Sequence, residues 1–266
     1  MLDAVTVSEP SPGGVNFDFL LVSSRWAVVL DGVSTYPVDD VGCRHGGEWF
    51  VNRLGAYFGA ALAIGSPDSS LQEVLATAIS RTAADHPECD LTNPLTPAAT
   101  VAAVRLRGAE LDWLVLGDAA VAWMNRAGDA DSVSDDRADH LANAPVVVAD
   151  VRRYDPAFVA KIRNQPGGFW VAAADPAAAA EAVCGTLNAT DLTRVGLFSD
   201  GITRLVDRYG WTWPQLFATV DTSGARALVS AVREAEQNDP DPGRWRGKPS
   251  DDASAVVARV VLAQQS

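Results

Sequence analysis

Apolar positions in the N-terminal part of the chain follow first a strand spacing and then a helix spacing. Residues 19–31 (FLLVSSRWAVVLD) predict a β-hairpin that turns near residues 23–25 and has a fully apolar second arm. Residues 47–63 and 70–86 place apolar side chains at helical intervals, and the second segment begins with serine and has an acidic first turn. A hairpin followed by two long helices is therefore expected.

The rest of the chain also arranges its strands and helices in blocks rather than in strict alternation. Residues 98–107 and 111–124 predict a second hairpin, whose return arm is interrupted by Gly117-Asp118. Strands are further expected at 146–149, 194–199 and 253–262, and helices at 175–184, 211–220 and 225–237. Residues 125–145 are polar and acidic, which is typical of an exposed connection.

Length and charge limit the classes of protein to which the chain can belong. With 266 residues, 48% of them hydrophobic, it is most simply a single domain with a sizeable core. The net charge of −13 argues against a nucleic-acid or anionic-membrane partner, because the phosphates would be repelled. The first residues lack a signal peptide pattern, and no stretch approaches the about 18 continuous apolar residues of a membrane span. We expect a soluble, cytoplasmic monomer.

The three cysteines do not change this picture. Cys43, Cys89 and Cys184 are widely spaced and follow no metal-ligand pattern, so their spacing supports neither a disulfide framework nor a zinc knuckle. A reducing compartment is expected.

Aspartates recur where apolar strands end. Asp31, Asp118, Asp200 and Asp251 each lie beside or inside an apolar β segment, and three of them adjoin a glycine; Asp18 opens the first hairpin. Asp-Gly is also ordinary turn chemistry, so each occurrence taken singly is explained by a turn. Together they indicate a cation site, because several buried carboxylates without partners are costly.

Hard divalent cations such as Mg²⁺ and Mn²⁺ prefer these oxygen ligands. Gly32 would let its carbonyl approach an ion with no side chain in the way. Two such ions could share a water molecule, lower its pKa and direct it at a phosphorus atom. The pattern therefore points to phosphate chemistry.

Seven short blocks, in this order, carry a resemblance to a known family. They are Asn16-Phe17-Asp18, Asp31-Gly32, Gly46-Gly47-Glu48, Ala99-Thr100, Gly117-Asp118-Ala119, Ser199-Asp200-Gly201 and Ser250-Asp251-Asp252-Ala253. The chain resembles bacterial members of the metal-dependent (type 2C) serine/threonine protein phosphatases from about residue 14 to 262. The resemblance implies an α+β fold: a four-layer α/β/β/α sandwich of two antiparallel sheets flanked by helix pairs.

The resemblance also implies a site and a reaction. Asp31 would bridge two Mn²⁺ or Mg²⁺ ions, the Gly32 carbonyl would bind one of them, and Asp200 and Asp251 would complete the shell of the first. Asp118, with Asp200, would hold a third, weaker ion. A metal-activated water would then hydrolyse phosphoserine or phosphothreonine in a protein substrate.

Two positions depart from the family pattern. Phe17 stands where the family usually has a glutamate for the second ion, so that ion would bind weakly or be held by another acid such as Asp18. Gly13 stands where an arginine usually grips the substrate phosphate. These departures keep open a phosphatase-like regulatory or binding module with weak or no catalysis. A plain interaction domain, whose Asp-Gly pairs are only turns, is a further alternative.

Two segments offer compensation for the missing groups. Residues 33–45 bring Arg44 and His45, which could bind phosphate or protonate a leaving alkoxide; alternatively, both simply begin the next helix and face solvent. Residues from about 125 to 170 fall where the family places a variable flap, which suggests a role in substrate choice.

Overall fold

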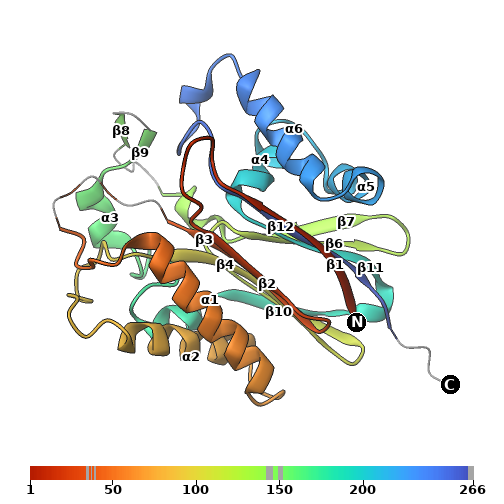
Figure 1. Ribbon diagram of the computed structural model, residues 1–266, viewed down its shortest axis with the longest axis horizontal. Coiled ribbons are helices and arrows are strands. Elements are labelled where there is room, and N and C mark those ends of the chain that lie inside the picture. Colours follow the sequence, from red (N-terminus) through yellow and green to blue (C-terminus); the bar gives the residue numbers. More distant parts are fainter. Residues whose placement is uncertain (34–35, 37, 39, 142–145, 149–151, 263–266) are drawn as a thin grey trace.

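Two antiparallel sheets of five strands each lie face to face, with helices on both outer sides (Figure 1). The computed structural model describes residues 1–33, 36, 38, 40–141, 146–148 and 152–262. In spatial order, the first sheet contains β10 (Val183–Asn188), β5 (Glu110–Leu116), β4 (Ala99–Arg107), β3 (Trp26–Gly32) and β2 (Asp18–Val22). The second contains β1 (Leu2–Glu9), β12 (Ala253–Val260), β11 (Leu192–Phe198), β6 (Ala120–Asn125) and β7 (Ala130–Val133).

Helices cover each sheet from outside. On the first sheet these are α1 (Gly46–Ile64) and α2 (Leu71–Ala84), and on the second α4 (Asp200–Asp207), α5 (Trp213–Ser223) and α6 (Arg226–Gln237). A small two-stranded sheet, β8 (Val146–Val148) with β9 (Arg152–Tyr154), lies with α3 (Pro156–Ile162) beside one end of the sandwich (Figure 1). Among the described residues, no helix combines the length and the apolar character needed to cross a membrane.

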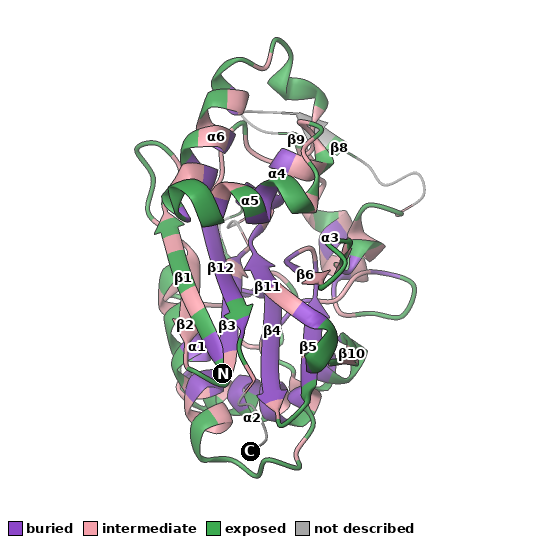
Figure 2. Cartoon of the chain, turned by 90° about the vertical axis from the view of Figure 1, so that its right-hand side faces the viewer, coloured by how far each residue is buried: buried purple, intermediate pink, exposed green. Residues whose placement is uncertain are grey.

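The strand period of two divides the core into layers. On β3, Val28 and Leu30 pack against α1 and α2, whereas Ala27 and Val29 pack between the two sheets. The central strands β4, β5, β11 and β12 are buried almost throughout, while the helices expose their outer faces (Figure 2). By the same alternation, Asp31 at the end of β3 faces the layer between the sheets.

The fold class predicted from the sequence is confirmed, and the differences are local. The interrupted arm at 111–124 is two strands, because Gly117, with a φ of +78°, lets the chain cross from β5 in one sheet to β6 in the other. The helix predicted at 175–184 is wrong: the chain forms a 3₁₀ turn over Pro176–Glu181 and then the edge strand β10. The edge strand β1 and the eight-residue helix α4 were not predicted.

Candidate metal centre

Three polar side chains line up across neighbouring strands at one end of the layer between the sheets. In the registers of β2, β3 and β4, Asp18 lies opposite Asp31, and Asp31 lies opposite Thr100. Directly opposed residues share a face of the sheet, with their Cβ atoms about 5 Å apart. The first sheet therefore contributes two adjacent carboxylates and a hydroxyl to one small region.

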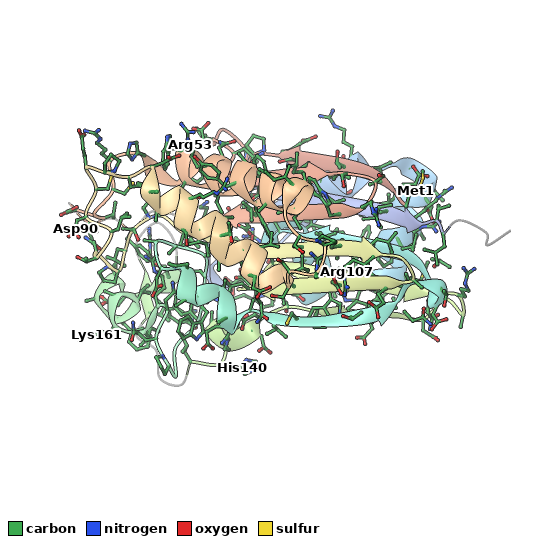
Figure 3. All side chains as sticks on the ribbon, turned by 90° about the horizontal axis from the view of Figure 1, so that it is seen from below. Met1, Arg53, Asp90, Arg107, His140 and Lys161 are labelled. Atoms are coloured by element: carbon green, nitrogen blue, oxygen red, sulfur yellow. The ribbon has the colours of Figure 1, made fainter. Side chains whose placement is uncertain are left out.

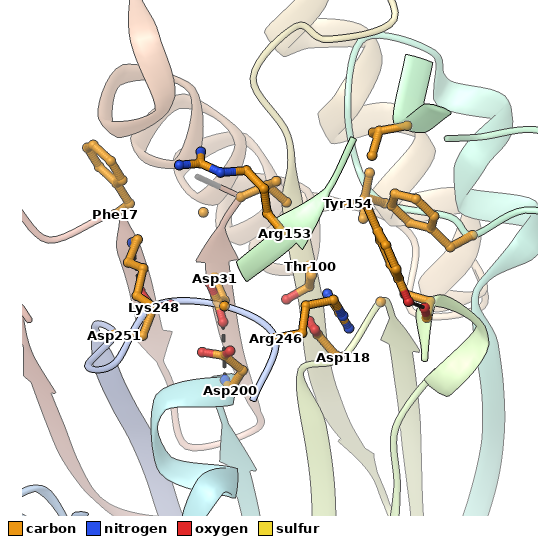
Figure 4. A pocket seen from close by; sticks show the side chains of 18 of the residues that line it. Phe17, Asp31, Thr100, Asp118, Arg153, Tyr154, Asp200, Arg246, Lys248 and Asp251 are labelled. Carbon is orange, nitrogen blue, oxygen red and sulfur yellow. Dashed lines mark hydrogen bonds and ion pairs between the residues drawn. The ribbon is translucent and has the colours of Figure 1, made fainter. Parts of the chain in front are cut away.

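The second sheet supplies further carboxylates to the same place. Asp200 follows β11 as the first residue of α4. Asp251 lies in the loop before β12, two residues ahead of the strand. The backbone N–H of Asp200 donates to Oδ2 of Asp31 over 3.1 Å, which joins the two sheets directly (Figure 4). Asp118 arrives from the crossing between β5 and β6.

These acids form the floor of a cavity of about 430 Å³. Asp31, Gly32, Asp118, Asp200 and Asp251 all line it, so the structure brings together five of the six residues predicted to bind metal. The sixth, Asp18, does not line the cavity. Its place in the cluster is set by the strand register.

Several oxygens of this cluster lack a donor among the described residues. They are buried atoms: both carboxylate oxygens of Asp18, Oδ1 of Asp200 and the hydroxyl of Thr100. Buried polar atoms normally have a partner, and an unsatisfied carboxylate is especially costly. These oxygens therefore lack a positive partner, and a bound cation would supply one.

The raised pKa values of the carboxylates show that their ionised forms are unfavourable in the absence of a cation. Burial raises the pKa of Asp18 to about 7, and repulsion from Asp252 and Asp200 adds to this. Burial, and then repulsion from Asp18 and the other acids, raises the pKa of Asp31 well above its ordinary value. Burial and the charge of Asp200 raise the pKa of Asp118 to about 7. Cations would reverse these shifts by favouring the ionised forms.

The donor set fits hard divalent ions. Carboxylate and carbonyl oxygens, with no thiolate or imidazole among them, are the ligands of Mg²⁺ and Mn²⁺. Gly32 lines the same cavity, and only glycine fits at this position, because a Cβ there would lie 2.5 Å from the carbonyl oxygen of Phe17. The residues present therefore match the predicted kind of site.

Two cations of the chain balance part of this negative charge. Arg204, which is 1% exposed, extends from α4 and pairs with Asp251 over 3.3 Å and with Asp200 over 3.6 Å. Lys248 lines the cavity and pairs with Oδ1 of Asp251 over 2.8 Å. Burial raises the pKa of Asp251, and repulsion from Asp200 adds to this, while Lys248 and Arg204 oppose it.

The structure shows the surroundings of Phe17 and Gly13, the two positions that depart from the family pattern. The Phe17 side chain borders the cavity on the same side as Lys248 and Asp251 (Figure 4). Its backbone N–H donates to Asp252 over 2.7 Å and its carbonyl accepts from Gly32, so the backbone is held although the carboxylate is missing. Gly13 has a φ of +75°, where an arginine would be strained.

The structure does not bring Arg44 and His45 to the acidic cavity. Arg44 forms an exposed ion pair with Glu88, and the His45 ring stacks on Trp49 at a centroid distance of 4.4 Å. Neither residue lines the cavity, because the segment after Gly32 has led both to the start of α1. The geometry therefore gives no support to the predicted catalytic and phosphate-binding roles of these two residues.

Other cations line the cavity instead. Arg246 and Lys248 come from the long loop before β12, and Arg152 and Arg153 come from β9. The loop sequence GRWRGKPSDD places three cations shortly before Asp251. This pattern is a signal that could have identified Arg246 and Lys248. Arg246 also pairs with Asp139 and lies over the ring of Tyr154.

The described part of the predicted flap divides between two places. Its beginning forms β7, which pairs with β6 in the second sheet. Its end contributes Tyr154, Val159, Phe169 and Trp170 to the wall of the cavity. Residues 142–145 and 149–151 lie outside the described residues. The end of the flap thus adds apolar side chains, together with Arg152 and Arg153, to the lining of the cavity.

Metal-free protein should lose stability as the pH rises through the range in which Asp18 ionises. Its pKa is about 7 in the folded state against an ordinary 3.8, so the folded protein holds a proton that the unfolded chain has released. This contribution is fully present below about pH 4 and is lost as the pH approaches about 7. Relative to Asp18→Asn, the wild type should lose about 1.4 kcal/mol of unfolding free energy for each pH unit within this range.

Urea unfolding in EDTA across this pH range measures the difference. Saturating Mn²⁺ should abolish it, because the cation favours the ionised carboxylate. Parallel stability curves for the wild type and Asp18→Asn in EDTA would contradict the assignment of this proton to Asp18.

The comparisons with known proteins agree with this geometry. The family model "Protein phosphatase 2C" matches residues 17–233. The catalytic domain of the serine/threonine protein phosphatase PstP in complex with two manganese ions is similar in fold, with a TM-score of 0.62, 18% identity and 98% coverage of each chain. PppA, a regulatory component of the type VI secretion system in Pseudomonas aeruginosa, gives a TM-score of 0.59 at 18% identity, with 98% of each chain covered.

A more distant structure is similar over nearly the whole chain. A sex-determining protein of Caenorhabditis elegans gives a TM-score of 0.61 at 12% identity over 98% of this chain, which spans 65% of that protein. No curated protein matches the sequence. At these identities the solved structures show the fold. The family follows from the model match over residues 17–233: the chain belongs to the protein phosphatase 2C family.

Proposed function

We propose that this chain is a metal-dependent phosphomonoesterase that hydrolyses phosphoserine and phosphothreonine in proteins. One observation carries the proposal: carboxylates from both sheets converge in one cavity, with buried oxygens that no described donor satisfies. Membership of a phosphatase family supports the reaction class.

In this proposal the chain's acids hold the ions. Asp31, the Gly32 carbonyl, Asp200 and Asp251 would bind the two principal Mn²⁺ or Mg²⁺ ions, with Asp18 behind them. Asp118 would hold a third with Asp200. When bound, such ions lower the pKa of a water molecule and neutralise charge that develops at phosphorus.

The residues around the floor would position the substrate. Lys248 and Arg246 line the cavity together with the acids, so a phosphate bound there would lie near both cations. They would offer the positive charge that Gly13 cannot provide, in addition to pairing with Asp251 and Asp139, although the Lys248 ammonium lacks the bidentate fork of arginine. The aromatic wall formed by Tyr154, Phe169 and Trp170 would exclude water around the phosphorylated side chain.

Hydrolysis of p-nitrophenyl phosphate and of a phosphothreonine peptide tests the proposal. Both should depend on Mn²⁺ and disappear in EDTA, and Asp200→Asn should lose activity because it removes a ligand charge. The exposed Asp68→Asn is the matched control and should keep wild-type activity. The absence of turnover with Mn²⁺ in folded wild-type protein would refute the enzymatic proposal.

Phe17 specifically favours a second candidate function, a regulatory or binding module with weak or no catalysis. If the missing carboxylate limits the second ion, Phe17→Glu should tighten its binding by about tenfold or more and raise activity in limiting Mn²⁺. Calorimetric titration with Mn²⁺ measures the affinity, and Phe17→Leu is the control without a carboxylate. If the wild type already binds two ions tightly and Phe17→Glu changes nothing, another acid serves that ion.

A further inference from the structure

Two cysteines and two histidines gather at one end of the α1–α2 pair, apart from the acidic cavity. Cys43 and His45 immediately precede α1, and His86 and Cys89 follow α2. The two helices lie side by side, and Asp90 marks this end of the molecule, opposite Met1 (Figure 3). We propose that these four side chains bind one Zn²⁺ ion as a tetrahedral structural site.

The four ligand atoms lie close enough together to surround one ion, and the two distances from His45 to the thiols match those of such a site. One ligand atom from each of the four residues lies within 4.8 Å of all the others. Nδ1 of His45 is 3.7 Å from Sγ of Cys43 and 3.4 Å from Sγ of Cys89. A tetrahedron with Zn–S bonds of about 2.3 Å and Zn–N bonds of about 2.0 Å separates its ligand atoms by roughly 3.4–3.8 Å.

The His86 ring is oriented for a ligand role. Its Nδ1 lies 2.9 Å from the carbonyl oxygen of Thr82, which fixes the proton on Nδ1 and leaves Nε2 with its lone pair. Metal-binding histidines characteristically make this second hydrogen bond to a carbonyl or carboxylate. Trp49 holds both imidazoles, since it stacks on His45 and meets His86 edge-on, each at a centroid distance of 4.4 Å.

The ligand chemistry separates this site from the acidic cavity. Two thiolates with two imidazoles are a typical Zn²⁺ set, whereas the oxygen ligands around Asp31 select Mg²⁺ or Mn²⁺. Four protein ligands close the coordination shell, which is the arrangement of structural rather than catalytic zinc. His86 is 5% exposed and the other three residues are partly buried. Binding would release the thiol protons of Cys43 and Cys89.

The ion would fasten together two loops that already touch. The N–H of Asp90 donates to the carbonyl of Gly42 over 2.8 Å, and Arg44 pairs with Glu88. The first loop follows Gly32, which lines the acidic cavity, and its Tyr36 lines that cavity as well. A zinc ion bound by Cys43 and His45 would thus fix the far end of a loop whose near end lies at the proposed metal-binding acids.

Metal analysis and cobalt substitution of the full chain, purified under reducing conditions, test the site. The protein should contain one equivalent of zinc. After its removal, one equivalent of Co²⁺ should produce the thiolate-to-cobalt charge-transfer absorption and the strong ligand-field bands of a tetrahedral site, which Zn²⁺ then abolishes. In the zinc-loaded protein one of the three thiols, that of the exposed Cys184, should react rapidly with a thiol reagent, and all three after chelation.

Variants assign the spectrum to these ligands. The double variant Cys43→Ser/Cys89→Ser should lose the thiolate band completely, while Cys184→Ser and Asp31→Asn should retain it, because neither touches the four ligands. A folded, reduced wild type that gives no thiolate band with Co²⁺ would overturn the proposal. So would a Cys43–Cys89 disulfide in the protein as isolated, or an unchanged spectrum in the double variant.

Discussion

Asp31→Asn should reduce Mn²⁺-dependent phosphatase activity by about 10³-fold or more, because ions at this site supply several kcal/mol of charge stabilisation. Asp31 is the acid closest to the middle of the cluster: it opposes Asp18 and Thr100 in the sheet and accepts a hydrogen bond from Asp200. After burial, the charges of Asp18, Asp200, Asp118 and Asp251 all raise the pKa of Asp31. Steady-state kinetics over a range of Mn²⁺ concentrations measures the loss.

The same substitution distinguishes whether Asp31 acts as a metal ligand or only supports the fold. Asparagine preserves the size of the side chain and can still accept the hydrogen bond from Asp200, and it relieves repulsion within the cluster. The metal-free variant should therefore be at least as stable as the wild type while its Mn²⁺ affinity falls. Near-normal activity at saturating Mn²⁺ would show that Asp31 does not bridge the ions.

Much of this site could be predicted from the sequence because its aspartates lie at the ends of strands. Asp31 and Asp200 follow apolar runs, and an antiparallel sandwich brings such ends together at one edge. Asp118 was marked by an interrupted strand, although the cause of the interruption, a crossing between sheets, depends on tertiary structure. The counter-charges were harder to recognise, because Arg204 on a short helix resembles an ordinary exposed arginine until its burial is known.

The cysteine–histidine cluster shows what spacing does not reveal. Cys43 and Cys89 are separated by two long helices, so they form no local ligand motif. They meet because α1 and α2 fold back on each other, which places the start of one beside the end of the other. His45 was accordingly predicted at the acidic site, since sequence distance from Asp31 was the available guide; the helix it precedes carries it elsewhere.

Arg204→Met should destabilise the metal-free protein by about 3–5 kcal/mol, because it leaves buried carboxylates without their counter-charge. Burial lowers the pKa of Arg204, but Asp200, Asp251 and Glu236 more than offset this and raise it. Its Nη1 donates to Oε1 of Glu236 over 2.9 Å, and Glu236 lies on α6 with 8% exposure. Arg204 thus joins α4, α6 and the loop that carries Asp251. Arg204→Lys keeps one charge but cannot reach three acids at once, so its effect should be intermediate.

Urea unfolding with and without Mn²⁺ distinguishes this role from simple packing. Bound cations would neutralise Asp200 and Asp251, so saturating Mn²⁺ should recover part of the stability lost in Arg204→Met, whereas a packing defect would persist unchanged. The control is Arg44→Ala, because the Arg44 side chain is 67% exposed and pairs with Glu88 at the surface; this variant should change stability by less than about 1 kcal/mol. Equal losses in EDTA and in Mn²⁺ would mean that Arg204 acts through its packing and not as the cation that balances the metal-binding acids.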